Sequence, residues 1–223
     1  MPQLHVLRVF TAPDGSAGNP LGVFVDGADV PADQRQAVAT DLGYSETVFV
    51  DDTATGELRI FTPGNELPFA GHPLVGTAWL LDTLDRLPDP LRPPAGEVPT
   101  WIEDGERWIR GRADWIGDIT YTQLDSPDNV TAMGADNDGY YWAWENKAHG
   151  HVRSRFFAPS FGIHEDPATG AAAVGLATQL ARPIQIRQGV GSILHARPGT
   201  DGTAEVGGLV VLDQQRDYAL PGR

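Results

Sequence analysis

Short apolar runs separated by turn-forming residues make up most of this chain, a pattern that is typical of a β-rich protein. The runs that we expect to form strands are residues 4–10, 21–25, 47–50, 58–61, 101–112, 119–124, 140–144 and 152–157, followed by shorter runs between residues 184 and 211. A proline-rich stretch between residues 82 and 99 predicts a linker or a surface excursion.

Three stretches have the pattern of helices. Residues 31–42 begin at a proline and are followed by Gly43, which fits the start and end signals of a helix. Residues 72–84 and 169–181 are apolar or small around nearly their whole circumference. A helix of that kind is buried. We therefore expect each of these two helices to be wrapped by its own sheet.

An internal repeat links these two helices. The first copy has Arg59-Ile60-Phe61-Thr62-Pro63 and then Gly71, Gly76, Ala78 and Leu81, and the second has Arg155-Phe156-Phe157-Ala158-Pro159 and then Gly170, Gly175, Ala177 and Leu180. Because both the strand and the helix pattern recur, duplication explains the repeat better than chance does. The prediction is an α+β fold of two pseudo-symmetric lobes, each a curled mixed β-sheet around a central buried α-helix. We place the lobes at residues 1–113 and 114–223, with the second one smaller and the last strand able to return to the first.

Composition excludes several classes of site. The 223 residues include no cysteine, which rules out disulfides, thiolate metal sites and a thiol base. The formal net charge of −14 disfavours nucleic acid and anionic membranes as partners. Neither a signal-peptide pattern nor an apolar run of membrane-spanning length is present, so we expect a cytoplasmic protein.

Helix N-termini offer a way for so acidic a chain to hold an anion. The first turn of a helix has unsatisfied N–H groups and a partial positive charge. Two such ends directed at one cleft between the lobes would hold a carboxylate by local electrostatics. On spacing alone, Pro73 and Thr169 could equally be ordinary helix-start residues.

The loops before the two buried helices carry the most specific motifs. They contain IFTPGNELPFAGHPLVG at residues 60–76 and EDPATG at residues 165–170, and a Gly-Asn-Pro turn lies at residues 18–20. Together with residues 45–50 (SETVFV), these blocks resemble the PhzF family, whose members isomerise or epimerise small metabolites on the diaminopimelate-epimerase fold. The resemblance is good over residues 4–84 and 152–190 and weak between residues 85 and 150.

This resemblance implies a mechanism and a set of site residues. The family's catalytic residues map to Glu46, His72 and Asp166, with Glu46 acting first as general base and then as general acid. The resemblance also implies a small-molecule carboxylate substrate, no metal, no organic cofactor and a possible homodimer. Apolar and aromatic neighbours of Glu46 would desolvate its carboxyl group and raise its pKa toward the working pH. The substrate-binding residues that we expect are Asn19, Ser45, Gly71, Thr169, Gly170 and Ala171.

Other interpretations of these residues stay open on the sequence alone. Asp166 could cap the second helix. His164, Glu165 and Asp166 could join His72 at a metal, although they lack a ligand-spaced partner. A two-thiol racemase is excluded by the lack of cysteine, and a serine hydrolase is disfavoured because residues 43–47 (GYSET) do not match G-x-S-x-G. The alternative from another class is a non-catalytic small-molecule-binding or interaction protein that retains the cleft.

Two departures from the family leave the substrate open, and with it the choice between isomerisation and epimerisation. Ala171 stands where the family often has serine, so a hydroxyl donor to the substrate is missing. The chain is also shorter than family members commonly are, and the shortfall lies between residues 117 and 152. We therefore expect a smaller second sheet and a reshaped pocket.

Overall fold

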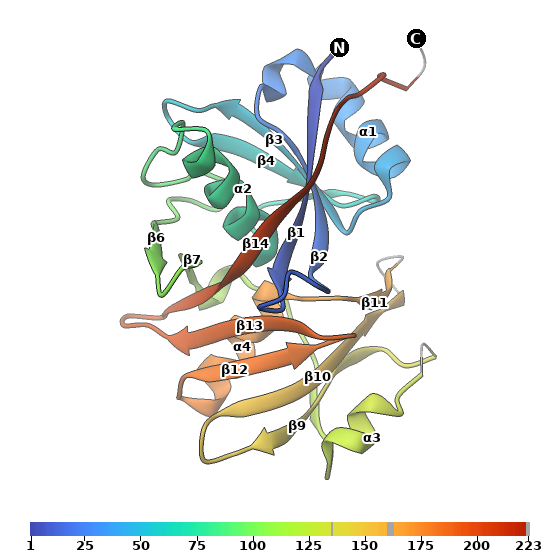
Figure 1. Ribbon diagram of the computed structural model, residues 1–223, viewed down its shortest axis with the longest axis vertical. Coiled ribbons are helices and arrows are strands. Elements are labelled where there is room, and N and C mark those ends of the chain that lie inside the picture. The colour runs from blue at the N-terminus through green and yellow to red at the C-terminus, as the bar shows by residue number, and fades with distance from the viewer. Residues whose placement is uncertain (135, 160–162, 222–223) are drawn as a thin grey trace.

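The computed structural model describes residues 1–134, 136–159 and 163–221, and its strands form one continuous mixed sheet that bends around two helices (Figure 1). The strands are β1 (Gln3–Thr11), β2 (Asn19–Phe24), β3 (Glu46–Asp52), β4 (Glu57–Phe61), β5 (Glu66–Leu67), β6 (Thr100–Glu103), β7 (Glu106–Arg112), β8 (Tyr121–Gln123), β9 (Gly139–Asn146), β10 (His151–Ala158), β11 (Ile163–Asp166), β12 (Ile184–Gln188), β13 (Ser192–Pro198) and β14 (Thr203–Asp217). The α-helices are α1 (Arg35–Leu42), α2 (Gly71–Thr83), α3 (Pro127–Thr131) and α4 (Gly170–Leu180).

The strand order along the sheet is β5-β4-β3-β2-β1-β14-β13-β12-β10-β9-β8, with β11 on β10 and the β6–β7 hairpin on β14. Strands β2 and β3, β10 and β12, and β8 and β9 pair in parallel, and the other pairs are antiparallel. The long strand β14 lies in the middle of this order and joins its two halves. Its first part, Thr203–Gly208, pairs with β7, and its last part, Leu209–Asp217, pairs with β1. The division of the chain near residue 113 stays a prediction.

The two buried helices predicted from their all-round apolar pattern are present. Helix α2 packs against β1, β2, β3, β7 and β14, and α4 packs against β13 and β14. Close packing explains a glycine inside α2, because a Cβ on Gly76 would lie 2.5 Å from a methyl group of Leu21 and 2.7 Å from one of Val9. The predicted fold class, a curled sheet around each helix, is confirmed.

The first part of the sheet is covered on both faces. Helix α1 packs on the face opposite α2, where it buries Val38 and Ala39 over a separate apolar cluster. That cluster includes the stacked rings of Phe24 and Phe49, with centroids 5.1 Å apart. Strands β2 and β3 are therefore held from both sides at the point where they present the site described below.

Several element boundaries differ from the sequence prediction. The expected single strand 101–112 is the β6–β7 hairpin, because Asp104 and Gly105 form a two-residue turn with φ values of 52° and 81°. Such positive values are characteristic of Asp-Gly hairpin turns. The first helix begins at Arg35 rather than residue 31, after a 3₁₀ turn over Ala32–Gln34. The short elements β5, β11 and α3 were not predicted.

Within the described residues, every helix is too short or too polar to cross a bilayer.

Candidate active site

Glu46 and His72 come together at the start of two neighbouring elements. Glu46 is the first residue of β3 and His72 lies in the first turn of α2. The Oε2 atom of Glu46 lies 3.2 Å from Nδ1 of His72, and their side chains are only 13% and 3% exposed. Within the part of the chain that the structure describes, Oε2 of Glu46 and Nε2 of His72 form no well-aligned hydrogen bond. These two polar atoms are therefore buried without a hydrogen-bond partner among the described residues.

The protonation of this pair follows from its burial. Desolvation raises the pKa of Glu46 to about 8, the negative charge of Asp166 adds to the rise, and a hydrogen bond from Ser45 opposes it. Desolvation also lowers the pKa of His72 to about 3, opposed by a contact with the Pro20 carbonyl. At neutral pH, His72 is uncharged and Glu46 holds its proton with a pKa near the working range of an acid–base catalyst.

Asp166 lies at the end of β11 and accepts hydrogen bonds on both carboxylate oxygens. Asn19 donates from Nδ2 to Oδ1 at 2.6 Å, and Thr169 donates from Oγ1 to Oδ2 at 2.6 Å. Ser45 donates in turn to Oδ1 of Asn19 at 2.7 Å. Burial raises the pKa of Asp166 to about 6, although these hydrogen bonds favour its ionised form and limit the rise. The network ties residues 19 and 45 to residues 166 and 169, which are far away in the sequence.

The N-termini of α2 and α4 lie against each other. A Cβ on Gly71 would lie 2.9 Å from Cα of Gly170, and a Cβ on Gly170 would lie 2.9 Å from the backbone nitrogen of His72. The backbone nitrogen of Ala171 is also close, 3.2 Å from that Gly71 Cβ position. No side chain of the described residues caps either helix. Two sets of unsatisfied N–H groups therefore converge beside Glu46 and Asp166, which suits an anionic group.

A hollow of about 240 Å³ opens beside this cluster. Its lining residues come from both ends of the chain: Asn19, Pro20, Gly43, Tyr44, Ser45, Pro63, Glu165 and Pro167. Glu46, His72 and Asp166 are largely buried and do not line it. The structure therefore has a compact buried cluster next to the hollow.

All nine residues predicted for the site thus lie in one connected region, but Gln188 was missed. It is fully buried and bonds to Thr169 and to the backbone of Asp166. The sequence pattern that could have identified Gln188 is its position in β12, where Ile184, Ile186 and Gln188 alternate with Gln185 and Arg187. A polar residue in the inward phase of a strand is unusual and predicts a buried hydrogen-bonding role.

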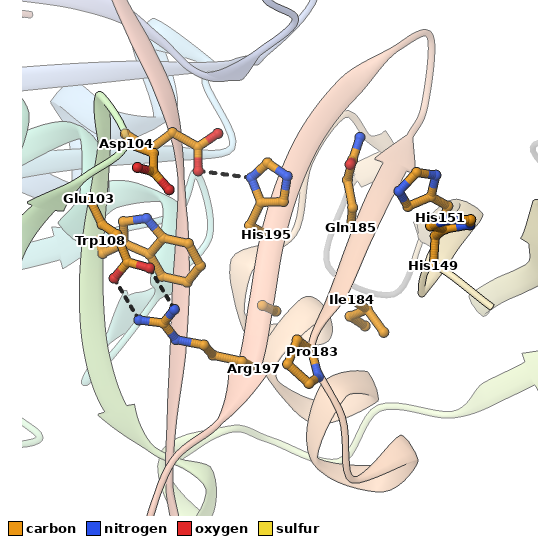
Figure 2. Close-up of a pocket in the computed structure, with 12 residues that line it drawn as sticks. Glu103, Asp104, Trp108, His149, His151, Pro183, Ile184, Gln185, His195 and Arg197 are labelled. Atoms are coloured by element: carbon orange, nitrogen blue, oxygen red, sulfur yellow. Dashed lines mark hydrogen bonds and ion pairs between the residues drawn. The ribbon is translucent and has the colours of Figure 1, made fainter. Parts of the chain in front are cut away.

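A larger hollow, about 400 Å³, lies elsewhere and contains none of the predicted residues (Figure 2). Figure 2 shows Arg197 paired with Glu103 on one side and His149 and His151 on the other, with Gln185 between His195 and His151. His195 lies 2.8 Å from Glu106. Gln185 and His195 are neighbours in register on β12 and β13, on the side of the sheet opposite the buried Ile186 and Leu194.

Metal ligation by His164, Glu165 and Asp166 finds no geometric support among residues 1–134, 136–159 and 163–221, where no group of three or more His, Asp or Glu side chains is arranged to hold an ion. Glu165 is instead held by Arg155, with N–O distances of 2.6 and 2.7 Å. That the reaction needs no metal stays a prediction.

Comparison with known proteins finds similar sequences of one family. A family model for phenazine biosynthesis-like proteins, PhzC-PhzF, matches residues 7–106 and 124–216. A curated relative from Pseudomonas fluorescens, trans-2,3-dihydro-3-hydroxyanthranilate isomerase, is 34% identical over 224 residues, covering 78% of this chain and 81% of the relative.

Solved structures show the same fold at lower identity. A PhzF-family phenazine biosynthesis protein from Enterococcus faecalis matches with a TM-score of 0.79 and 19% identity, covering 98% of this chain and 99% of that one. A hydroxyproline epimerase from Agrobacterium vitis matches with a TM-score of 0.58 and 13% identity, covering 96% and 91%. The resemblance inferred from the sequence motifs is confirmed.

Proposed function

The chain belongs to the PhzC-PhzF family of phenazine biosynthesis-like proteins and is an isomerase, and from this premise we propose that Glu46 moves a proton between two carbons of a small carboxylate-bearing substrate. The proposed reaction uses no cofactor. The Pseudomonas fluorescens relative is named for trans-2,3-dihydro-3-hydroxyanthranilate, so this cyclic amino acid is the first substrate to test. The alternative of a non-catalytic binding protein is set aside, because the chain is an isomerase.

The convergent helix ends are the proposed binding place for the substrate carboxylate. The N–H groups at the starts of α2 and α4 lack side-chain caps, and Gly71 and Gly170 bring them together. Among the described residues, neither Lys nor Arg lines the adjacent hollow. Backbone dipoles therefore supply the positive potential that an acidic protein otherwise lacks. Asn19 and Ser45 line the hollow and also bond to the buried network, so they would contact the rest of the substrate.

The proton transfer balances within the substrate. Ionised Glu46 removes a proton from one carbon, the electron pair of that C–H bond shifts the adjacent double bond, and protonated Glu46 returns the proton to the far carbon. Neutral His72, 3.2 Å from Glu46, orients the carboxyl group. Asp166 keeps both oxygens occupied by donors and so acts on Glu46 through its charge.

The observation that carries this proposal is the buried Oε2 of Glu46. It has no well-aligned hydrogen bond within the described residues, lies beside neutral His72, and belongs to a carboxyl group whose pKa is raised to about 8. A carboxyl group of raised pKa in a dry site is suited to alternate between base and acid.

Hydrogen–deuterium exchange tests the proposal directly. The enzyme is incubated in D2O with trans-2,3-dihydro-3-hydroxyanthranilate, and deuterium entering substrate and product carbons is followed by NMR. We expect Glu46→Gln to fold and to bind the substrate, since the amide is nearly isosteric, but to slow exchange by about 10²–10⁴-fold. Glu57→Gln, a change of the same type at the exposed start of β4, is the control and should exchange at the wild-type rate.

Wild-type exchange by Glu46→Gln would overturn the proposed role of Glu46. A wild-type enzyme that binds the acid but never exchanges its carbon-bound protons would overturn the substrate assignment. The homodimer and the cytoplasmic location stay predictions.

A further inference from the structure

Gln188 lies outside the sequence motifs that predicted the catalytic residues. It is the last residue of β12, fully buried, and faces Ser154 of β10 and Ser192 of β13 across the sheet. Its side chain reaches from the sheet to the loop that begins α4. A buried primary amide at the end of a strand needs a partner for each of its polar groups.

The amide of Gln188 has all of these partners. Nε2 donates to the Asp166 carbonyl at 2.8 Å and to Oγ1 of Thr169 at 2.9 Å, while Oε1 accepts from the Thr169 backbone N–H at 3.2 Å. A flipped amide would place its oxygen against the carbonyl oxygen and its NH2 against the N–H. The network therefore fixes the orientation of the amide.

The orientation of the Gln188 amide also determines the direction in which the Thr169 hydroxyl donates its hydrogen. Because Oγ1 accepts a hydrogen bond from Gln188, its own hydrogen points to Oδ2 of Asp166, 2.6 Å away. Thr169 is the N-cap residue of α4, a position at which threonine ordinarily accepts a hydrogen bond from the first helical N–H groups. Here it makes no such bond, and the start of α4 stays uncapped.

We propose that Gln188 is a positioning residue, which holds the Thr169 hydroxyl against Asp166 and thereby keeps the N-terminal N–H groups of α4 free for the substrate carboxylate. The inference rests on the proposed function, because it takes those N–H groups as the anion-binding place. Gln188 itself touches neither the adjacent hollow nor Glu46 among the contacts that the structure records.

The test measures binding of 3-hydroxyanthranilate, a stable aromatic acid with the same carbon skeleton, by isothermal titration calorimetry. Gln188→Met keeps the length of the side chain but removes its hydrogen bonds, so Thr169 becomes free to cap α4. We expect Kd to rise about tenfold, the equivalent of one charge-assisted hydrogen bond. KM for the substrate should rise more than kcat falls. Gln185→Met, the same change on the outward side of β12 (Figure 2), is the matched control and should bind as the wild type does.

A second substitution distinguishes positioning from a packing role. In the Gln188→Met background, Thr169→Ala removes the hydroxyl that would cap the helix. We therefore expect the double variant to bind 3-hydroxyanthranilate more tightly than Gln188→Met alone. If Gln188 only supports packing, Thr169→Ala should weaken binding further or leave it unchanged, and either result overturns the inference. Should Gln188→Met fail to fold, Gln188→Asn, which keeps the amide but cannot reach Thr169, carries the same expectation.

The outcomes also separate this inference from the proposed function. If the wild-type protein does not bind 3-hydroxyanthranilate but still isomerises trans-2,3-dihydro-3-hydroxyanthranilate, the same comparison of variants is made on KM. If wild type does neither, the proposed substrate class fails, and with it the inference. If wild type binds the acid and Gln188→Met binds it equally well, the inference alone is wrong.

Discussion

Glu46 and His72 show how burial sets the protonation of a site before any substrate arrives. Each group is shifted toward its neutral form, Glu46 upward to about 8 and His72 downward to about 3. Both shifts have desolvation as their largest cause. The contact between them at neutral pH is therefore one between two uncharged groups rather than an ion pair.

The raised pKa of Glu46 predicts how activity depends on pH. A general base must be ionised in the free enzyme, so kcat/KM should rise with pH and level off above about pH 8. We expect this limb in the pH profile of the wild-type enzyme measured with trans-2,3-dihydro-3-hydroxyanthranilate. A profile that is flat from pH 6 to pH 9 would contradict Glu46 as the base.

The same shift predicts how stability depends on pH. The folded protein holds the Glu46 proton up to about pH 8, whereas the unfolded chain releases it near 4.5. The stabilising contribution of protonated Glu46 is therefore complete below about pH 4.5 and is lost as pH rises toward 8, by up to about 1.4 kcal/mol per pH unit. Because Glu46→Gln lacks this loss, its stability relative to wild type should increase from pH 5 to pH 8 in chemical denaturation. An unchanged difference across that range would show that Glu46 is not buried in its neutral form.

Helices α2 and α4 meet at glycines because no side chain fits between their first turns. A Cβ at either Gly71 or Gly170 would lie 2.9 Å from the backbone of the other helix, closer than carbon atoms normally approach. The proposed sharing of one ligand by the two helix ends depends on this close contact.

Substituting one of these glycines tests the contact. Gly71→Ala forces the helix ends apart, and we expect a loss of about 1–3 kcal/mol in the free energy of unfolding. Binding of 3-hydroxyanthranilate should weaken as well. Gly117→Ala is the control, because no heavy atom lies within 4 Å of its Cβ position, and its stability should change by less than about 1 kcal/mol. Equal stabilities for the two variants, measured by urea denaturation, would show that the contact between the helix ends can accommodate a methyl group at residue 71.

Element patterns in the sequence predicted these helices well and the polar details less well. The all-round apolar pattern of residues 72–84 and 169–181 was sufficient, because burial on every side requires it. The Asp104-Gly105 turn also had its signal in the sequence, but the apolar residues on both sides of it, Trp101 and Trp108, favoured one long strand. Gln188 was missed because its role depends on Thr169 and Asp166, which only the folded chain brings within reach.

Strand β14 connects the two parts of the sheet. Its first six residues pair with β7 and eight of its last nine pair with β1, so one continuous strand belongs to both parts of the sheet. One apolar cluster also contains residues from both buried helices, among them Leu74 and Leu176.

This continuity predicts cooperative unfolding. We expect one transition, with coincident curves from far-ultraviolet circular dichroism and tryptophan fluorescence and equal calorimetric and van't Hoff enthalpies. Tryptophan fluorescence would detect separate unfolding of either part of the sheet, since Trp79 lies in α2 and Trp142 lies in β9. Two resolved transitions would mean that the parts unfold independently despite sharing β14.

The contact between Gly71 and Gly170 has a further consequence, because the two glycines occupy the same place in the repeated pattern. Equivalent residues touch one another at the two-fold axis of an isologous homodimer. The contact between the two copies of the pattern thus resembles the contact at the axis of such a dimer, and the proposed ligand-binding place lies beside it. A true homodimer must present the same residue from both sides of that axis. In this chain the next position is His72 in one copy and Ala171 in the other, so the proposed binding place would present different chemistry to the two sides of a bound molecule.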